Sequence, residues 1–293
     1  MSDFDRWTIG ATHLTPIVEA ETRHIPTQLF YPEATGADVC AASEWLVPGA
    51  ADADGSGITF RVQAFVIEHA GRTILVDPCV GNAKHLAMPF WHQLDLPWLE
   101  DLRRAGYNPD DIDLVVHTHL HEDHIGWDTH LVDGEWVPTF PRARHVYVGD
   151  ELDWASTEAR QRDPEPFPES IEPVLRAGLG DEVNADADLG DGLRLLSTPG
   201  HTPGHASLLV ETDAELLLVS GDLLHHPFQF ASPDVAEVGD VDAPLARRTR
   251  KDFFAEFARD DVVVAGTHFP IEPVGRIRPD GGRWRFEVAM ADA

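Results

Sequence analysis

The sequence predicts a mixed α/β or α+β protein, because strand-like and helix-like patterns alternate along most of its 293 residues. Residues 58–66 alternate between apolar and polar side chains, which is the period-two pattern of a strand with one buried face. Residues 243–259 carry apolar side chains at helical spacing. Short apolar runs, as expected for buried strands, recur at 73–76, 114–116, 216–219 and 262–265. These strands are too numerous for a helix bundle.

The first elements in chain order are a short strand at 7–9 and a region in which Pro16 and Pro26 act as breakers. Small polar residues at 50–57 predict a surface loop, because such residues cannot build a core. The alternating strand that follows turns at Ala70-Gly71 and returns as a second, apolar strand. These residues therefore form a hairpin that enters a buried sheet.

Further along the chain, an N-cap and an early proline at Asp95-Leu-Pro97 predict a helix of about ten residues that ends at Gly106. A second helix is expected over 169–177. A turn at 279–282 closes a terminal hairpin. The remaining expected strands are 142–148, 193–197, 206–211 and 215–220.

We expect a single domain over 1–293, with an N-terminal extension (1–57), a core (58–270) and a C-terminal hairpin (271–293), because no linker of useful length interrupts the pattern. The two cysteines offer no disulfide framework and suggest a reducing compartment. The first residues are acidic and lack the basic and apolar segments of a signal peptide. The expected location is therefore the cytoplasm.

The charge of the chain limits its partners. It has 51 Asp and Glu against 22 Lys and Arg, a formal net charge of −29 at pH 7. Such a surface repels nucleic acid and anionic membranes, and no apolar run approaches the length of about 18 residues that a membrane span needs. A small neutral substrate is the expected partner. The oligomeric state, including a homodimer, stays open.

The strongest signal is the segment Thr118-His-Leu-His-Glu-Asp-His124, which follows an apolar strand. On an extended backbone alternate residues share a face, so His119, His121 and Asp123 can point to one place. A turn at His124 adds a fourth donor. Three imidazoles and a carboxylate suit a borderline ion such as zinc. A buried cluster of unpaired imidazoles would be costly, which favours a metal site over a plain polar loop.

Three further predicted strands also end in residues that can bind a metal. The turn His201-Thr-Pro-Gly-His205 follows one of them, and its residues alone leave open which histidine binds and which braces the loop. Asp222 follows the second strand and His268 the third. A carboxylate with two oxygens can bridge two ions about 3.5–4 Å apart. Jointly, these strand ends predict a metal site.

Taken in order, these residues resemble the ligand pattern of the metallo-β-lactamase superfamily of binuclear metallohydrolases: His119-x-His121-x-Asp123-His124, then His201, Asp222 and His268. The resemblance covers roughly residues 58–270. It implies an αββα four-layer sandwich, in which two mixed β-sheets pack face to face with helices outside. The site is then expected along one edge of the sandwich.

The resemblance also implies two Zn²⁺ ions, without excluding manganese, cobalt or iron. It favours His201 over His205 as the ligand, and it assigns Asp77 to brace the ligand segment. The implied ligands are His119, His121 and His201 for one ion, Asp123, His124 and His268 for the other, and Asp222 as the bridge.

Among the branches of this superfamily, the lactonase and organophosphate-hydrolase-like branch fits best, since the run from Gly221 to Pro227 is similar to one in that branch. Three other branches fit less well. The flavodiiron branch carries Glu where this chain has His121, and glyoxalase II proteins end in a helical region where this chain has a predicted hairpin. Nucleases act on polyanions, which the negative charge of this chain would repel. One departure is His225. Quorum-quenching lactonases often place a tyrosine there, so either His225 takes over its role or the substrate class differs.

The expected function is therefore hydrolysis of a neutral lactone or ester, of the N-acyl homoserine lactone type, through a metal-bridging hydroxide. The expected catalytic residues are Asp123, Asp222 and His225, with Asp222 or His225 carrying the proton to the leaving alkoxide. The alternative is an aryl-ester, β-lactam or phosphotriester hydrolase on the same site. The remote alternative is a non-catalytic metal-binding protein.

Aromatic residues near the ligand segments are candidates for the substrate pocket. Trp127 and Phe228 are the expected pocket residues, because they follow closely on ligand residues in the sequence. His92, His117 and His145 lie outside the implied ligand set and are interpreted as structural.

Overall fold

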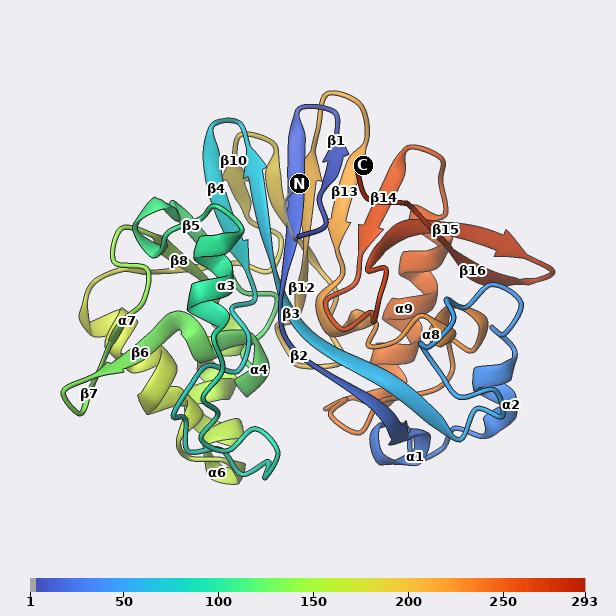
Figure 1. Cartoon of the computed structure of the whole chain (residues 1–293), viewed down its shortest axis with the longest axis horizontal. Coiled ribbons are helices and arrows are strands. Elements are labelled where there is room, and N and C mark those ends of the chain that lie inside the picture. The colour runs from blue at the N-terminus through green and yellow to red at the C-terminus, as the bar shows by residue number, and fades with distance from the viewer. Residues whose placement is uncertain (1–3, 293) are drawn as a thin grey trace. The chain divides into compact units, whose positions relative to one another are not determined.

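The computed structural model of the chain describes residues 4–292 and confirms a mixed α/β architecture (Figure 1). The chain divides into two compact units, which are described separately. Unit 1 comprises residues up to Glu19 and Val62–Ala185, and unit 2 comprises Ala20–Arg61 and the residues from Asp186 onward. Neither unit is continuous in sequence, so the expected single domain stays a prediction.

The first sheet has seven strands in the order β1-β2-β3-β4-β5-β8-β9, and the chain passes between the units within β2 and β3. The strands are β1 (Trp7–Ile9), β2 (Thr12–Pro26), β3 (Gly57–His69), β4 (Arg72–Val76), β5 (Leu114–Val116), β8 (Arg144–Val148) and β9 (Gly180–Val183). Strands β4, β5, β8 and β9 run parallel, with Val76 opposite Val116 and Val116 opposite Val146. This register brings the residues that follow β4 and β5 to the same edge of the sheet.

Short helices and a two-stranded ribbon complete unit 1. The ribbon pairs β6 (Thr129–Val132) with β7 (Glu135–Pro138). The helical elements are α3 (Trp98–Arg104), η1 (Pro109–Asp111), α4 (Glu122–Ile125), η2 (Gly126–Asp128), α5 (Gly149–Trp154), the π-helix η3 (Ala155–Ala159), α6 (Arg160–Arg162), the π-helix η4 (Phe167–Ile171) and α7 (Glu172–Arg176). Within a core cluster of this unit, Leu120 and Ile125 pack with Trp154 and Ile171.

The second sheet lies in unit 2 and has seven strands in sequential order. They are β10 (Asp188–Gly190), β11 (Leu193–Ser197), β12 (Ala206–Glu211), β13 (Leu216–Val219), β14 (Val262–Ala265), β15 (Val274–Asp280) and β16 (Arg283–Val288). All neighbours are antiparallel except β13 and β14, whose last residues, Val219 and Ala265, lie opposite each other. Asp222 and His268 each follow three residues later, so this parallel pair brings both residues to one edge.

The helical elements of unit 2 are α1 (Thr27–Phe30), α2 (Gly36–Cys40), η5 (Gly221–Leu223), α8 (Phe228–Ala231) and α9 (Ala243–Phe257). On α9, Phe253, Phe254 and Phe257 lie on one face and pack into a core that includes Phe230 and Phe286. Each such phenylalanine contributes about 1.5–3 kcal/mol by burial. Among the described residues, no helix combines the length and the apolar character needed to cross a membrane.

The structure corrects some of the expected elements. Pro16 does not break the chain but lies inside β2. Proline lacks a backbone N–H, but β1 pairs with β2 only up to Leu14, so no hydrogen bond to β1 is lost at Pro16. The helix expected from Asp95 begins at Trp98, directly after Pro97. The turn between β15 and β16 and the helix near 169–177 are confirmed.

Candidate metal-binding site

The first group of candidate ligands lies in unit 1, in a segment that we call the ligand loop (residues 118–127). It follows β5, and the apolar side chains of Leu120 and Ile125 anchor it in the core. His119 is fully buried, and its Nε2 atom lies 3.0 Å from Nδ1 of His121. Imidazole nitrogens this close together match the spacing of ligands around one cation.

Asp123 and His124 come one turn later, in the short helix α4. The Nε2 atom of His124 lies 3.6 Å from Oδ1 of Asp123. Asp77, at the end of β4, accepts hydrogen bonds at 2.8 Å from both the amide and the hydroxyl of Thr118, and it lies 3.1 Å from Nδ1 of His124. Asp77 therefore fixes the start of the ligand loop and orients one ring in it, as expected from the sequence.

A buried carboxylate holds the other end of the ligand loop. Glu19 accepts hydrogen bonds from the amides of Val80 at 2.8 Å and Gly81 at 3.1 Å, and from the indole of Trp127 at 2.6 Å. Burial raises the pKa of Glu19 to about 7. Trp127 is itself only 3% exposed and stacks on Trp98, so the role seen here is to hold the loop, and its role in a substrate pocket stays a prediction.

Gly126 lets the ligand loop approach the segment after β4. Its amide donates to the carbonyl of Cys79 at 2.7 Å. A Cβ atom at this position would lie 1.6 Å from the carbonyl oxygen of Val80, so no larger residue fits without a shift of the backbone.

The second group of candidate ligands lies in unit 2 and surrounds Asp222. The Oδ2 atom of Asp222 lies 3.4 Å from Nε2 of His201 and 3.0 Å from Nε2 of His225. Its Oδ1 atom lies 3.2 Å from Nε2 of His268. Each carboxylate oxygen thus faces a different imidazole, which is the arrangement expected of a carboxylate that bridges two cations.

Carbonyl and carboxylate groups orient two of these rings. His201 Nδ1 lies 3.1 Å from Oδ1 of Asp240, and His268 Nδ1 donates to the carbonyl of Arg61 at 2.7 Å. Both rings therefore turn Nε2 toward Asp222. Burial alone would raise the pKa of Asp240, but the neighbouring His201 ring lowers it to about 2. In both units the donors are imidazole nitrogens and carboxylate oxygens, a set that fits zinc and other borderline divalent ions.

The structure also separates the roles of the two histidines in the turn after β11. His201 faces the carboxylate of Asp222, whereas His205 accepts the Asp222 amide at its Nε2 atom, at 3.0 Å, and holds Thr198 through Nδ1. His205 therefore braces the backbone of Asp222. This distinction depends on the direction of each ring, which the repeated Pro-Gly-His pattern does not reveal.

Three charged residues near Asp222 were not found from the sequence. Glu237 Oε2 lies 3.8 Å from Nε2 of His225, and burial raises the pKa of Glu237. Asp240 and Glu237 come from an irregular segment without a motif. Arg250 could have been noticed in the sequence, because it is a charged residue at a position on the apolar face of α9, which it shares with Phe253, Phe254 and Phe257.

Phe228, the other expected pocket residue, is fully buried in unit 2. Its ring meets Tyr31 edge-on, with 4.8 Å between the ring centroids. The structure thus gives it a packing role in α8, and its contact with substrate stays a prediction.

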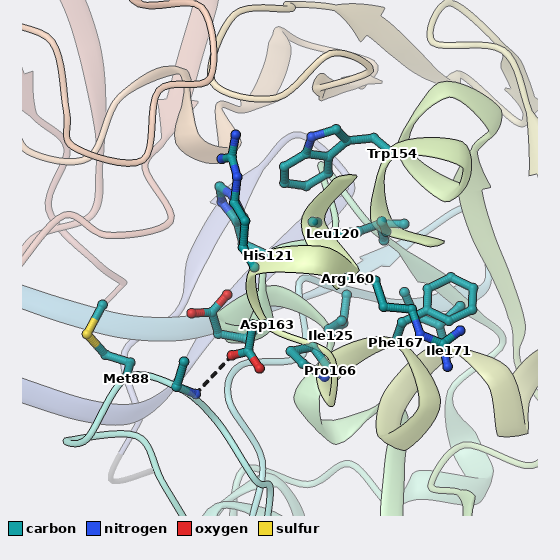
Figure 2. A pocket seen from close by; sticks show the side chains of 15 residues that line it. Met88, Leu120, His121, Ile125, Trp154, Arg160, Asp163, Pro166, Phe167 and Ile171 are labelled. Atoms are coloured by element: carbon teal, nitrogen blue, oxygen red, sulfur yellow. Dashed lines mark hydrogen bonds between the residues drawn. The ribbon is translucent and has the colours of Figure 1, made fainter. Parts of the chain in front are cut away.

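A cavity of about 320 Å³ adjoins the ligand loop within unit 1. Figure 2 shows Trp154, Leu120 and His121 beside it, and the rings of His121 and Trp154 meet edge-on at 5.3 Å. The π-helices η3 and η4 both contribute to its wall, and such helices are frequent at functional sites. Its apolar lining is Ala87, Met88, Leu120, Ile125, Trp154, Ala155, Ala159, Pro166, Phe167 and Ile171.

Charged side chains also line this cavity. Asp163 accepts a hydrogen bond from the amide of Ala87 at 2.9 Å (Figure 2). Arg160 lies over the ring of Phe167 and pairs with Glu172 at 3.2 Å. Glu122 and Arg162 line the cavity as well. Because most of the lining is apolar, the cavity suits an apolar group beside His121, with charged side chains around it.

A family model described as the metallo-beta-lactamase superfamily matches residues 57–283. An N-acyl homoserine lactonase from Bacillus sp is 34% identical over 112 residues, which cover 38% of this chain and 38% of that relative. The lactonase AttM from Rhizobium radiobacter is 29% identical over 183 residues, which cover 54% of this chain and 62% of the relative. The chain thus spans about two fifths of the first relative's length.

Solved structures resemble the whole chain. A hydrolase named AbOPH, in the beta-lactamase superfamily, has a TM-score of 0.81 at 24% identity and covers 100% of this chain and 99% of its own. AidC, described as a dizinc quorum-quenching lactonase, has a TM-score of 0.78 at 21% identity, with 99% and 98% covered. At these identities the likeness shows a shared fold, and it confirms the fold class expected from the sequence.

Proposed function

The chain belongs to the metallo-beta-lactamase superfamily, and from this premise we propose that it is a binuclear metal-dependent hydrolase that opens a neutral lactone or ester. The observation that carries the proposal is the surroundings of Asp222, whose two carboxylate oxygens face different histidines at 3.0–3.4 Å. An arrangement of this kind suits two ions that share one ligand.

The ligand assignment that the resemblance implies is part of this proposal. The proposed ligands are His119, His121 and His201 for one ion, Asp123, His124 and His268 for the other, and Asp222 for both. The donor chemistry of each cluster supports this assignment, as does the description of AidC as a dizinc lactonase. Zinc is the proposed metal, and manganese, cobalt and iron remain alternatives with the same donors.

Bound zinc supplies a Lewis acid and lowers the pKa of water to about 7. The protein's own contribution is to orient the ligands and to move a proton. His225 Nε2 lies 3.0 Å from Oδ2 of Asp222, so this pair could take up the proton that the attacking water releases and return it to the leaving alkoxide. Nδ1 of His225 is buried and has no hydrogen-bond partner among the described residues. Asp123 is the third proposed catalytic residue, acting as a ligand.

The cavity beside His121 supports a substrate that carries an apolar group. Its lining is mainly aliphatic and aromatic, and its volume of about 320 Å³ falls at the small end of small-molecule sites. The net charge of −29 disfavours polyanions, which supports a neutral bond as the target. The relatives named N-acyl homoserine lactonase are consistent with an acyl lactone.

The test is a substrate panel with zinc-loaded protein. Lactones with acyl chains of increasing length are compared by kcat/KM with p-nitrophenyl esters, a β-lactam and a phosphotriester. We expect lactones to dominate and the longer acyl chains to be preferred until the cavity is full. Dominance of aryl esters, the β-lactam or the triester would replace the lactone assignment. Failure to hydrolyse any of them, with unchanged results in His119→Ala, would favour a non-catalytic metal-binding protein.

A further inference from the structure

A second polar cluster in unit 1 has no part in the proposed ligand set. His117, Asp128, His145 and Tyr147 are all at most 1% exposed. Asp128 Oδ1 lies 3.0 Å from Nε2 of His117 and 3.1 Å from Nδ1 of His145, and Oδ2 accepts from the hydroxyl of Tyr147 at 2.9 Å. Three side chains therefore converge on one buried carboxylate.

The hydrogen bonds determine the charge of His117. Its Nδ1 atom lies 3.0 Å from the carbonyl oxygen of Val146, and its Nε2 atom lies 3.0 Å from the carboxylate of Asp128. Both partners can only accept, so both ring nitrogens must donate and the ring is a cation. Asp128 supplies the matching negative charge.

The position of this ion pair in the chain is specific. His117 directly precedes the ligand loop, and Asp128 directly follows it. Residues His145 and Tyr147 lie in β8, the parallel neighbour of β5. The pair thus closes the ligand loop at both ends, and β8 holds the closed ends against the rigid sheet.

We propose that His117, Asp128, His145 and Tyr147 form a clasp that keeps the ligand loop in its metal-binding conformation, with Asp128 as a positioning residue. This proposal rests on the proposed function, since it assigns the loop to metal binding. An open loop would lose conformational entropy when it binds a metal, whereas a loop closed in advance has already lost most of it. The clasp should therefore increase metal affinity without touching the metal.

The cluster is not itself proposed as a metal site. The donor atoms of His117, Asp128 and His145 are close enough together for a cation. However, both nitrogens of His117 donate hydrogen bonds, so its ring has no lone pair left for a metal. The three hydrogen bonds to Asp128 also use its oxygens without any ion.

The test compares two Tyr→Phe variants of the full chain. Tyr147→Phe removes one donor from Asp128 and keeps both charges of the clasp. Tyr107→Phe is the matched control, because its hydroxyl also donates to a carboxylate of unit 1, Glu68, at 3.0 Å. Zinc affinity is measured by competition with a chromophoric chelator. We expect Tyr147→Phe to weaken zinc binding by about threefold, less than the roughly tenfold effect of losing a direct partner of a ligand, and Tyr107→Phe to leave it unchanged.

A stronger variant and a second readout complete the test. Asp128→Asn removes the counter-charge of His117 and is expected to weaken zinc binding by about tenfold, the lower end for direct partners of ligands, because Asp128 acts on the ligands only through the loop. In metal-free protein, amide hydrogen exchange over the ligand loop should accelerate in Tyr147→Phe but not in Tyr107→Phe. This measurement stays decisive even if Asp128→Asn does not fold.

Equal zinc affinities for Tyr147→Phe and Tyr107→Phe, with unchanged exchange in the ligand loop, would overturn the clasp. A purely structural cluster gives that result, with similar falls in unfolding temperature for the two variants. If the wild-type protein binds no zinc, the proposed function fails instead. The exchange comparison in metal-free protein then still decides whether the clasp orders the loop.

Discussion

The two clusters of candidate ligands, one in each unit, are built in different ways. In unit 1 the candidates lie in one short segment after a single strand, so their spacing in the sequence places them together. In unit 2 His201, Asp222 and His268 follow three different strands, and the register of the sheet brings Asp222 and His268 to one edge. A local motif therefore specifies the first cluster, and tertiary structure specifies the second.

The supports of the two clusters differ in the same way. In unit 1, Asp77 and Glu19 bind backbone and loop side chains, so each holds a segment that carries several ligands. In unit 2, Asp240 contacts the ring of a single ligand, His201. Loss of a support should therefore disturb more ligands in unit 1 than in unit 2.

The largest effect is expected at Asp222, the residue on which both proposed ions depend. Asp222→Ala should lower kcat/KM for the preferred lactone by about 10²–10⁴-fold, because it removes a ligand and a proton carrier together. The control is Asp252→Ala, which removes an exposed carboxylate from α9. Activity of Asp222→Ala within a few-fold of this control would contradict the proposed role.

The next effect tests the support of the ligand loop. Asp77→Ala removes the partner of the Thr118 amide and hydroxyl and the neighbour of His124 Nδ1. Zinc affinity, measured by chelator competition, should fall by about 100-fold, the upper end for such outer partners. Wild-type affinity in folded Asp77→Ala would show that the loop holds its shape without this carboxylate.

A smaller loss is expected in unit 2. Asp240→Ala leaves His201 without the carboxylate that faces its Nδ1 atom, but the other rings near Asp222 keep their places. We expect zinc affinity to fall by about tenfold, the lower end of the range for such partners. A loss larger than that of Asp77→Ala would reverse the contrast between the units.

The smallest effect concerns Arg250 and Lys84, two basic side chains buried in different units. Arg250 in unit 2 donates to the carbonyls of Leu223 and Val235 at 2.9 and 2.8 Å. Lys84 in unit 1 donates to Thr129 and to the carbonyl of Glu169. Burial lowers the pKa of Lys84 to about 7, so its charged form is not fully compensated.

Between pH 7 and about 10.5, the unfolded chain therefore binds a proton at Lys84 that the folded chain lacks. The free energy of unfolding should rise with pH in this window, by at most about 1.4 kcal/mol per pH unit from this group. Lys84→Met should remove that rise, which urea unfolding at pH 7.5 and 9 can measure. The same pH dependence in both proteins would mean that Lys84 stays charged when folded.

The same contrast explains what the sequence could predict. The spacing of His119, His121, Asp123 and His124 is a local pattern, and their shared segment is visible without a structure. The choice between His201 and His205 depended on ring directions. Glu237 and Asp240 lie in a segment without a periodic pattern, so only the folded chain shows them near His225 and His201.

The clasp shows a further limit of sequence reasoning. His117 and His145 were expected to be structural, and they indeed bind no proposed metal ligand directly. Their partner Asp128 carries no signal, because a single aspartate after a Gly-Trp pair is usually exposed. The register of β5 and β8, together with the return of the chain after α4, is needed to bring the three residues together.

Metal content measures the central claim most directly. Elemental analysis of the purified full chain, reconstituted with zinc and freed of excess ions, should give about two zinc ions per chain, as expected for a binuclear site. Asp222→Ala should hold fewer than the wild type. A wild-type chain that retains none, or only one that Asp222→Ala also retains, would contradict a binuclear centre built around this carboxylate.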